Sequence, residues 1–270
     1  SKTGLINVKN LLLVTLLFCI VSISGCASNG GGIIATNDTF LILEATTSDS
    51  YVTLAQKHLG DKIQTRISSV LDHGKYIMGP EVNELEMQLE KFTGAKYAVA
   101  TSNGTSALHI ALLLANVAKN DEVITTPFTF YATIGAIVSV GAKPVFVDIN
   151  PDTWNIDTDS ISKNITSKTK AIMAVSLFGL PLDIEPIMDL AKKHNLIVID
   201  DSAETITGNH KGKFPGTHAD MAVYSFENKK HMSSGSEGGM VITSNPDLAR
   251  KVRKFSGMRW YIQVCEGIFR

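Results

Sequence analysis

Residues 224–240, YSFENKKHMSSGSEGGM, join two apolar segments through a polar turn that carries two lysines. Residues 221–226 have the pattern of a short buried strand, and residues 238–244 that of a second strand entered through paired glycines. A lysine at the end of a strand can attack a carbonyl as an amine once its ammonium group is desolvated and loses its proton. Lys229 and Lys230 are both candidates for this role, and two ordinary surface lysines in a hairpin turn are the alternative.

Upstream of this turn, short apolar runs alternate with helical patterns. The pattern predicts strands at residues 97–100, 122–125, 144–148, 171–176 and 196–200. It predicts helices at residues 54–71, 81–92, 105–117, 131–140, 157–165 and 184–194. Because strands that alternate with helices form βαβ units, we expect an α/β fold with a mostly parallel sheet covered on both faces. Ligands bind such sheets at the carboxyl ends of the strands, so we expect the site there.

Two of these strand ends offer groups that suit a flat phosphorylated ligand. Residues 101–107, TSNGTSA, open a helix with small residues, and free N–H groups at a helix N-terminus bind phosphate. The spacing matches neither a P-loop nor a dinucleotide motif, and an ordinary Ser/Thr N-cap is the alternative. Residues 126–131, TPFTFY, place aromatic rings where a flat ring can stack, with core packing as the alternative.

Adjacent carboxylates follow the fifth predicted strand in residues 199–204, IDDSAE. They can bind a metal, cap a helix, or supply one carboxylate that pairs with a cationic ring nitrogen. With the lysine amine, the chain thus offers a phosphate site, a stacking aromatic, a carboxylate and a nucleophile. A planar, phosphorylated pyridine aldehyde needs these four groups, and pyridoxal phosphate (PLP) is such a molecule.

Composition excludes several other classes of protein. The net charge is −1 and no basic stripe occurs, which argues against nucleic-acid binding. The chain has only three cysteines, far apart and without a CxxC pair, so we expect neither a disulfide framework nor a zinc site. A chain of 270 residues with 44% hydrophobic residues is long enough for one substantial core.

The N-terminal residues differ from the rest of the chain. Lys2 and Lys9 precede an apolar run at residues 11–23, and Ser-Gly-Cys follows at 24–26. This order is typical of a secretory signal, and the sequence before Cys26 resembles a lipobox in which that cysteine is lipidated. A buried or disordered apolar leader is the alternative. Residues 27–50 are rich in Gly, Thr and Ser and have the composition of a linker.

Residues 51–259 resemble the DegT/StrS-type nucleotide-sugar aminotransferases, a PLP-dependent family of fold type I. The resemblance rests on YIMGPEVNELE, TSNGTSALHIAL, DEVITTPFTFYAT, GAKPVFVDI, KAIMAVSLFG, VIDDSAE and YSF…K…EGGMV, which follow one another in the order of the family. It implies the three-layer large domain of that fold. It also implies transfer of an amino group, usually from glutamate, to a nucleotide-linked keto-sugar for amino-sugar or cell-surface polysaccharide biosynthesis. A homodimer located in the cytoplasm is implied as well, which conflicts with an exported leader.

The resemblance also assigns roles to individual residues. Lys230, five residues after Ser225, matches the lysine that bonds to the cofactor, with Lys229 as the fallback. Asp201 matches the aspartate that pairs with the pyridine nitrogen. The remaining cofactor-binding matches are Phe130 on the ring face, Glu204 near the phenolic oxygen, and Gly104, Thr105, Ser106 and Ser225 around the phosphate.

Two departures from the family pattern stand out. Between Lys230 and Glu237 the chain has one residue more than the family pattern. The resemblance fades after residue 259, and residues 260–270 do not continue toward the small C-terminal domain of the family. We therefore expect that the chain lacks this domain. A catalytically silent PLP-binding protein and a lipid-anchored scaffold protein are the alternatives to an active enzyme.

Overall fold

The structure, a computed structural model, describes residues 31–36, 39–44, 63–227, 229–234 and 237–256. The leader-like segment 1–26 with Cys26 and the tail 260–270 lie outside the described residues. Within the stretch of linker-like composition, β1 (Gly31–Thr36) and β2 (Thr39–Glu44) pair as an antiparallel hairpin. None of the helices in the described ranges combines the length and apolarity that a membrane span needs.

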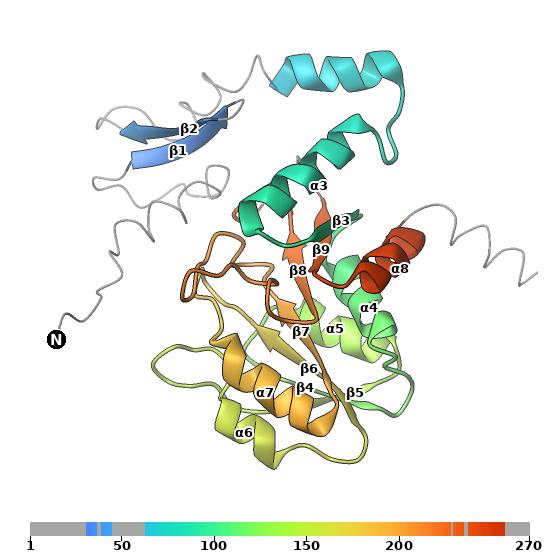
Figure 1. The fold of residues 1–270 in the computed structure, drawn as a ribbon, viewed down its shortest axis with the longest axis vertical. Helices are drawn as coiled ribbons and strands as arrows, with labels where there is room; N and C mark the ends of the chain where they lie inside the picture. The colour runs from blue at the N-terminus through green and yellow to red at the C-terminus, as the bar shows by residue number, and fades with distance from the viewer. Residues whose placement is uncertain (1–30, 37–38, 45–62, 228, 235–236, 257–270) are drawn as a thin grey trace, which may run out of the picture.

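A seven-stranded sheet forms the centre of the fold, with the strand order β3–β9–β8–β7–β6–β4–β5 (Figure 1). Neighbouring strands pair in parallel except at β9, which is antiparallel to both β3 and β8. The prediction of a mostly parallel sheet is therefore confirmed. The strands are β3 (Tyr97–Thr101), β4 (Glu122–Thr125), β5 (Lys143–Phe146), β6 (Thr169–Val175), β7 (Ile197–Asp201), β8 (Met221–Ser225) and β9 (Gly239–Thr243).

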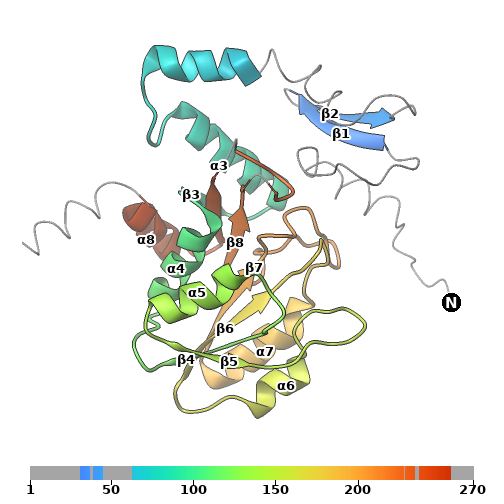
Figure 2. The ribbon, with the colours of Figure 1, turned by 180° about the vertical axis from the view of Figure 1, so that it is seen from behind.

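Helices cover both faces of this sheet, as the two opposite views in Figures 1 and 2 show. One face packs against α4 (Gly104–Leu114), α5 (Tyr131–Ser139) and α8 (Pro246–Ser256). The opposite face packs against α3 (Pro80–Thr93), α6 (Thr158–Lys163) and α7 (Ile184–His194). A helix at residues 63–73 precedes α3. The three-layer arrangement agrees with the predicted fold class.

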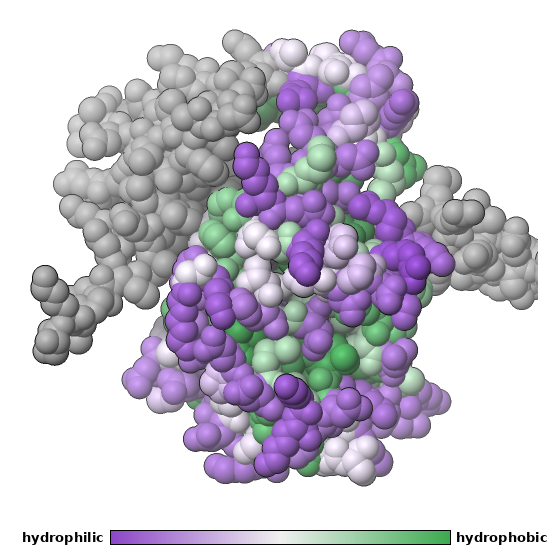
Figure 3. Space-filling view, viewed as in Figure 1, coloured by the Kyte–Doolittle hydropathy of each residue, from purple (hydrophilic) through white to green (hydrophobic). Residues whose placement is uncertain are grey.

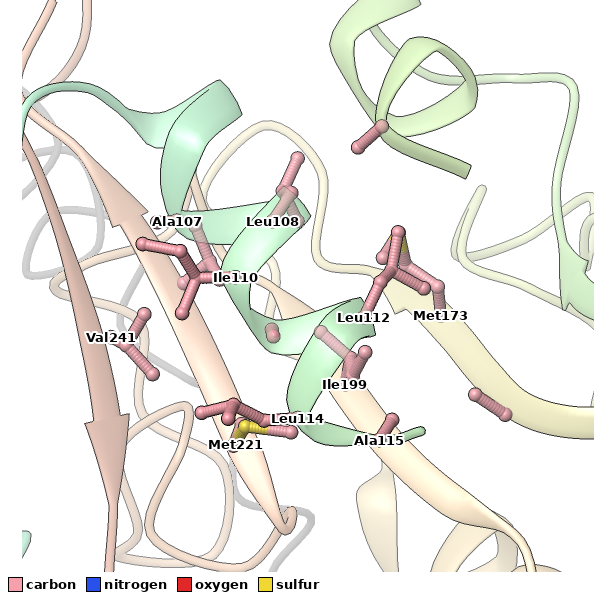
Figure 4. Packing of buried hydrophobic residues seen from close by; sticks show 14 of the residues in the cluster. Ala107, Leu108, Ile110, Leu112, Leu114, Ala115, Met173, Ile199, Met221 and Val241 are labelled. Atoms are coloured by element: carbon pink, nitrogen blue, oxygen red, sulfur yellow. The ribbon is translucent and has the colours of Figure 1, made fainter. Parts of the chain in front are cut away.

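The alternation of side chains along β8 assigns each face its own core. Met221 and Val223 contribute to the cluster under α4, whereas Ala222 and Tyr224 contribute to the cluster under α3. Figure 4 shows the residues of α4 lying against Met173, Ile199, Met221 and Val241 from four neighbouring strands. On the side of the molecule seen in Figure 3, hydrophilic residues cover much of the described surface, which fits helices that bury only one side.

Helix α8 was not anticipated by the sequence pattern, and an ion pair ties it to α3. Nη1 and Nη2 of Arg253 each donate to one carboxylate oxygen of Glu86 at 2.6 Å, and the carboxylate also accepts the N–H of Ala100 at 2.8 Å. Glu86 is buried, and the Arg253 side chain is 38% exposed. A bidentate pair of this kind is strong because both charges keep directed hydrogen bonds.

Arg253→Ala is expected to lower the free energy of unfolding by about 3 kcal/mol, because it leaves the buried Glu86 carboxylate without its counter-ion. Arg250→Ala on the same helix is the matched control, since its partner Asp247 is exposed and such pairs contribute less than about 1 kcal/mol. Urea unfolding of the two variants measures the difference. Equal losses in both would contradict a stabilising role for the Glu86–Arg253 pair.

Candidate active site

Because the six strands other than β9 run in one direction, their carboxyl ends lie along one edge of the sheet. The predicted site residues follow β3, β4, β7 and β8 and therefore meet at this edge, as is usual for open α/β sheets. The carboxylate at the end of β7 and the lysine loop after β8 are direct neighbours, because those two strands pair in parallel.

Lys230 lies in the loop after β8, and its side chain is only 13% exposed. Its Nζ donates to Oε1 of Glu204 at 3.0 Å and lies 5.1 Å from the centre of the Phe130 ring. Lys229 is exposed, and its backbone N–H donates to Glu227. The structure thus brings Lys230 together with two other predicted residues and leaves the Lys229 side chain toward solvent.

Phe130 is the N-cap residue of α5, in the segment that follows β4. Its ring is about half exposed and packs against Tyr131, with the two ring centres 4.3 Å apart. The exposed part of the ring together with the nearby Lys230 amine suits a stacking role better than the core packing that the sequence left open.

Asp201 is the last residue of β7 and is buried. Its Oδ2 accepts a hydrogen bond from the Thr133 hydroxyl at 2.7 Å, and its Oδ1 accepts the N–H of Ala203 at 3.3 Å. Burial raises the pKa of this carboxyl, while the Thr133 hydrogen bond and the nearby Lys230 charge oppose the rise. The side chain is thus a fixed, largely dehydrated acceptor that a cationic partner would stabilise in its charged form.

Thr133 is a site residue that the sequence reasoning missed. Its hydroxyl also lies 2.8 Å from that of Thr129, so a short hydroxyl chain supports Asp201 from the first turn of α5. A threonine inside an apolar helical pattern carries no signal of this contact, because the partner is 68 residues away in sequence.

The N-terminus of α4 lies beside the end of β8. Asn103 is the N-cap, and its Oδ1 accepts the N–H of Ser106 at 2.7 Å. A Cβ at Gly104 would lie 2.8 Å from the Ser225 Cβ, closer than side chains tolerate. Glycine is therefore required where the helix start meets the strand. Gly104 and Ser225 meet here, and Ser106 and the exposed Thr105 lie in the same helical turn as Gly104.

Glycine is also required at the start of β9. A Cβ at Gly239 would lie 2.4 Å from the backbone carbon of Asn103. Gly239, the second of the paired glycines in the opening stretch, therefore allows β9 to pass close to the α4 N-terminus.

Asp200, next to Asp201 on β7, points to the opposite face of the sheet, as alternation requires. Its Oδ1 accepts hydrogen bonds from the hydroxyls of Ser202 at 2.7 Å and Ser176 at 3.0 Å. Burial raises the pKa of Asp200 to about 6, against the lowering effect of these bonds. The two adjacent carboxylates therefore do not form one site, and a shared metal is not what this geometry supports. Within the described residues, no group of three or more His, Cys, Asp or Glu side chains is arranged to hold a metal ion.

Asp200→Asn is expected to gain stability relative to the parent protein as the pH rises from 4 to 7. In this range the unfolded chain loses the Asp200 proton near its ordinary pKa of 3.8, while the folded protein holds it up to about 6. Between these two pH values the free energy of unfolding of the parent therefore falls by up to about 3 kcal/mol. The variant has no carboxyl at this position and does not show this fall. Urea unfolding at a series of pH values measures the difference, and a difference that does not change with pH would contradict the assignment.

With this geometry established, comparison with known proteins matches residues 57–260 to the DegT/DnrJ/EryC1/StrS aminotransferase family. The chain belongs to this family. A protein of Geobacillus stearothermophilus named "Pleiotropic regulatory protein" is 43% identical over 197 residues, which cover 73% of this chain and 53% of that protein. The UDP-2-acetamido-2-deoxy-3-oxo-D-glucuronate aminotransferase of Pseudomonas aeruginosa is 41% identical over 201 residues, which cover 74% of this chain and 56% of that enzyme.

Solved structures also share this fold, among them a DegT DnrJ EryC1 StrS aminotransferase from Brucella abortus, with a TM-score of 0.71 and 31% identity over 75% of this chain and 56% of that one. The Bacillus subtilis protein NtdA, solved with bound cofactor PMP, matches with a TM-score of 0.69 and 35% identity over 73% of this chain and 44% of that one. The chain spans about half the length of the curated relatives it matches.

Proposed function

We propose that this chain carries the cofactor-binding half of a PLP-dependent aminotransferase that acts on a nucleotide-linked keto-sugar, with glutamate as the amino donor. The observation that carries the proposal is the meeting of the Lys230 amine, the Phe130 ring and the Glu204 carboxylate beside the buried Asp201. The sugar-nucleotide aminotransferase of P. aeruginosa supports the substrate class.

The residues present fit PLP on independent physical grounds. The first turn of α4, kept free of a side chain at Gly104, suits the phosphate group together with the hydroxyls of Ser106 and Ser225. Phe130 offers a ring face, and Asp201 offers a buried carboxylate for a protonated ring nitrogen. When bound, PLP serves as the electron sink for carbanion chemistry at the amino donor.

Each residue then has a defined task. Lys230 holds the cofactor covalently through Nζ and, when released, moves a proton as a general acid–base. Asp201 keeps a proton on the ring nitrogen by placing its negative charge there, and Thr133 keeps the carboxylate oriented. Glu204 holds the Lys230 amine in place through the 3.0 Å contact.

A glutamate half-reaction tests the proposal without knowledge of the sugar. The purified chain, supplied with PLP and then with glutamate, should release about one equivalent of the corresponding keto acid per bound cofactor in a single turnover. Bound PLP without release of keto acid would instead support the catalytically silent alternative. The absence of both binding and release would support the scaffold alternative.

We also propose that the chain forms a homodimer. Exposed apolar side chains at two places support the proposal, because a second copy of the chain would cover them. They are Ile63, Ile67 and Leu71 on the helix at 63–73, and Tyr131 and Val138 on α5. Sedimentation velocity should give a dimer that the combined change Ile67→Asp and Val138→Asp converts to a monomer. A parent protein that sediments as a monomer at all concentrations would contradict this assembly.

A further inference from the structure

Three large aromatic side chains form an exposed cluster that the proposed chemistry does not use. The rings of Phe128, Trp154 and Phe178 touch pairwise, with centres 5.9, 6.2 and 6.0 Å apart and interplanar angles between 71° and 88°. Their exposed fractions are 41%, 51% and 62%. Edge-to-face contacts leave ring faces that the other two rings do not cover. We call these three residues the aromatic trio.

The trio lies on the ligand side of the sheet and next to the candidate active site. Phe128 and Phe178 follow the carboxyl ends of β4 and β6, and Phe128 is two residues from Phe130. Gly179, which follows Phe178, donates its N–H to the Glu204 carbonyl at 3.0 Å, and the Glu204 side chain contacts Lys230. One continuous set of contacts thus connects the trio to the lysine.

Two members of the trio are held in a backbone conformation that bulky residues avoid. The φ angle is +60° at Trp154 and +50° at Phe178. Such a conformation disfavours bulky side chains and persists only where the surroundings enforce it. Glycine or asparagine would fit both positions more easily. Large rings thus occupy two positions whose backbone conformation favours small residues, and the rings remain exposed there.

A buried side chain fixes the two strained loops to each other. Asn155, which follows Trp154, donates from Nδ2 to the carbonyls of Leu180 and Pro181 at 3.3 Å each, and its Oδ1 accepts the N–H of Leu177 at 3.4 Å. Asn150 closes the other side of the Trp154 turn, because its carbonyl accepts the Trp154 N–H at 2.8 Å. The rings are thus held in place before any ligand arrives, which reduces the ordering cost of binding.

We propose that the aromatic trio is the stacking platform for the base of the nucleotide that carries the keto-sugar. This inference rests on the proposed function, because it assumes a nucleotide-linked substrate. A nucleobase is a flat ring that stacks on exposed aromatic side chains. In a nucleotide sugar the base is separated from the sugar by a ribose and a diphosphate. A base site beside the lysine, but outside its direct contacts, therefore suits this ligand.

The test is a titration of the full chain with UDP and with GDP in a Trp260→Phe background. The sequence has two tryptophans, Trp154 and Trp260, so the remaining fluorescence then reports on the trio. Stacking of a base on Trp154 should quench this fluorescence in step with the binding isotherm measured by calorimetry. No binding of either nucleotide, or binding that leaves Trp154 fluorescence unchanged, would overturn the proposal.

Phe178→Gly separates a ligand role from a packing role. Glycine adopts positive φ without strain, which offsets the loss of the two ring contacts, so the variant should unfold at a temperature close to that of the parent. It should nevertheless bind the nucleotide about 5- to 150-fold more weakly, the range that loss of one base stack produces. Trp154→Gly should behave alike in calorimetry. Tyr76→Ala is the matched control, because Tyr76 is equally exposed at 63% and lies before α3, outside the trio.

Two outcomes of the variants would overturn the assignment. Unchanged nucleotide affinity in both glycine variants would do so. So would conversion of a dimer to a monomer by Phe178→Gly with unchanged affinity, because the trio would then be a subunit contact. Lysine-bound cofactor, measured in the same samples by borohydride fixation and mass spectrometry, reports separately on the proposed aminotransferase site. Failure of cofactor attachment therefore does not resemble failure of nucleotide binding.

Discussion

Lys230→Ala is expected to abolish covalent attachment of PLP and to lower the glutamate half-reaction by at least about 10²–10⁴-fold. The variant removes the amine that holds the cofactor, and general acid–base catalysis alone typically contributes a factor of this size. In the structure this amine is largely buried between the Phe130 ring and the Glu204 carboxylate. Borohydride reduction followed by peptide mapping of the parent protein should find the adduct on Lys230.

Lys229→Ala is the matched control for this prediction, because it removes a neighbouring lysine of the same turn that is exposed. It should retain both the adduct and the half-reaction. A reduced adduct on Lys229 in the parent protein would reverse the assignment of the two lysines. Glu204→Gln should keep the adduct, since an amide oxygen can still accept a hydrogen bond from the Lys230 amine.

Much of the fold follows from the sequence because its helices and strands have strong periodicity. The predicted bounds of β4 and α7 agree with the structure residue for residue, and those of the other predicted strands agree to within a few residues. Apolar runs of four to seven residues between helical patterns are typical of strands buried on both faces. The order of the strands in the sheet and the reversed direction of β9 depend on contacts between distant segments, which periodicity does not report.

Two helices show where the pattern fails. Helix α8 is rich in charged residues, yet Ala249 and Val252 are buried against the core, and Asn245 accepts N–H groups of its first turn. The sequence of this segment thus contains an N-cap residue and an apolar stripe. The many charged residues around them hide the periodic pattern that would predict a helix. In the helix at 63–73 the apolar stripe is real, but Ile63, Ile67 and Leu71 are exposed in the single chain. Periodicity predicts that a face will be covered, not what covers it.

In the candidate site, too, some residues could be predicted from the sequence and their supporting contacts could not. Strand ends and residue types pointed to two lysines, two adjacent carboxylates, the aromatics of residues 126–131 and the α4 N-terminus, because the ends of parallel strands converge. The choice of Lys230, Asp201 and Phe130 among them came from the resemblance to the family. The supporting contacts were not predictable. Thr133 reaches Asp201 across 68 residues, and Asn155 joins two loops more than twenty residues apart. Such contacts depend on how a helix and a loop are placed on the sheet, and a single hydroxyl or amide leaves no periodic trace in sequence.

Asp201→Asn is expected to lower the half-reaction by about 10²-fold or more while leaving the fold intact. The amide keeps the shape of the side chain and can accept the Thr133 hydrogen bond, but it has no charge to hold a proton on the ring nitrogen. Loss of one partner of a buried charge pair costs about 3–5 kcal/mol, which corresponds to this reduction in rate or more.

Stability separates the electronic role of Asp201 from a structural one. Because burial raises the pKa of the Asp201 carboxyl more than Thr133 and Lys230 lower it, the charge of Asp201 is unfavourable in the protein without cofactor. The asparagine variant, prepared without cofactor, should therefore unfold at the same temperature as the parent or higher. Thr133→Val is the companion variant. It removes one hydrogen bond to the carboxylate but not the charge, so it should slow the half-reaction by only about tenfold. Near-normal turnover of Asp201→Asn, or a larger loss in Thr133→Val than in Asp201→Asn, would show that the charge of Asp201 does not act on the cofactor.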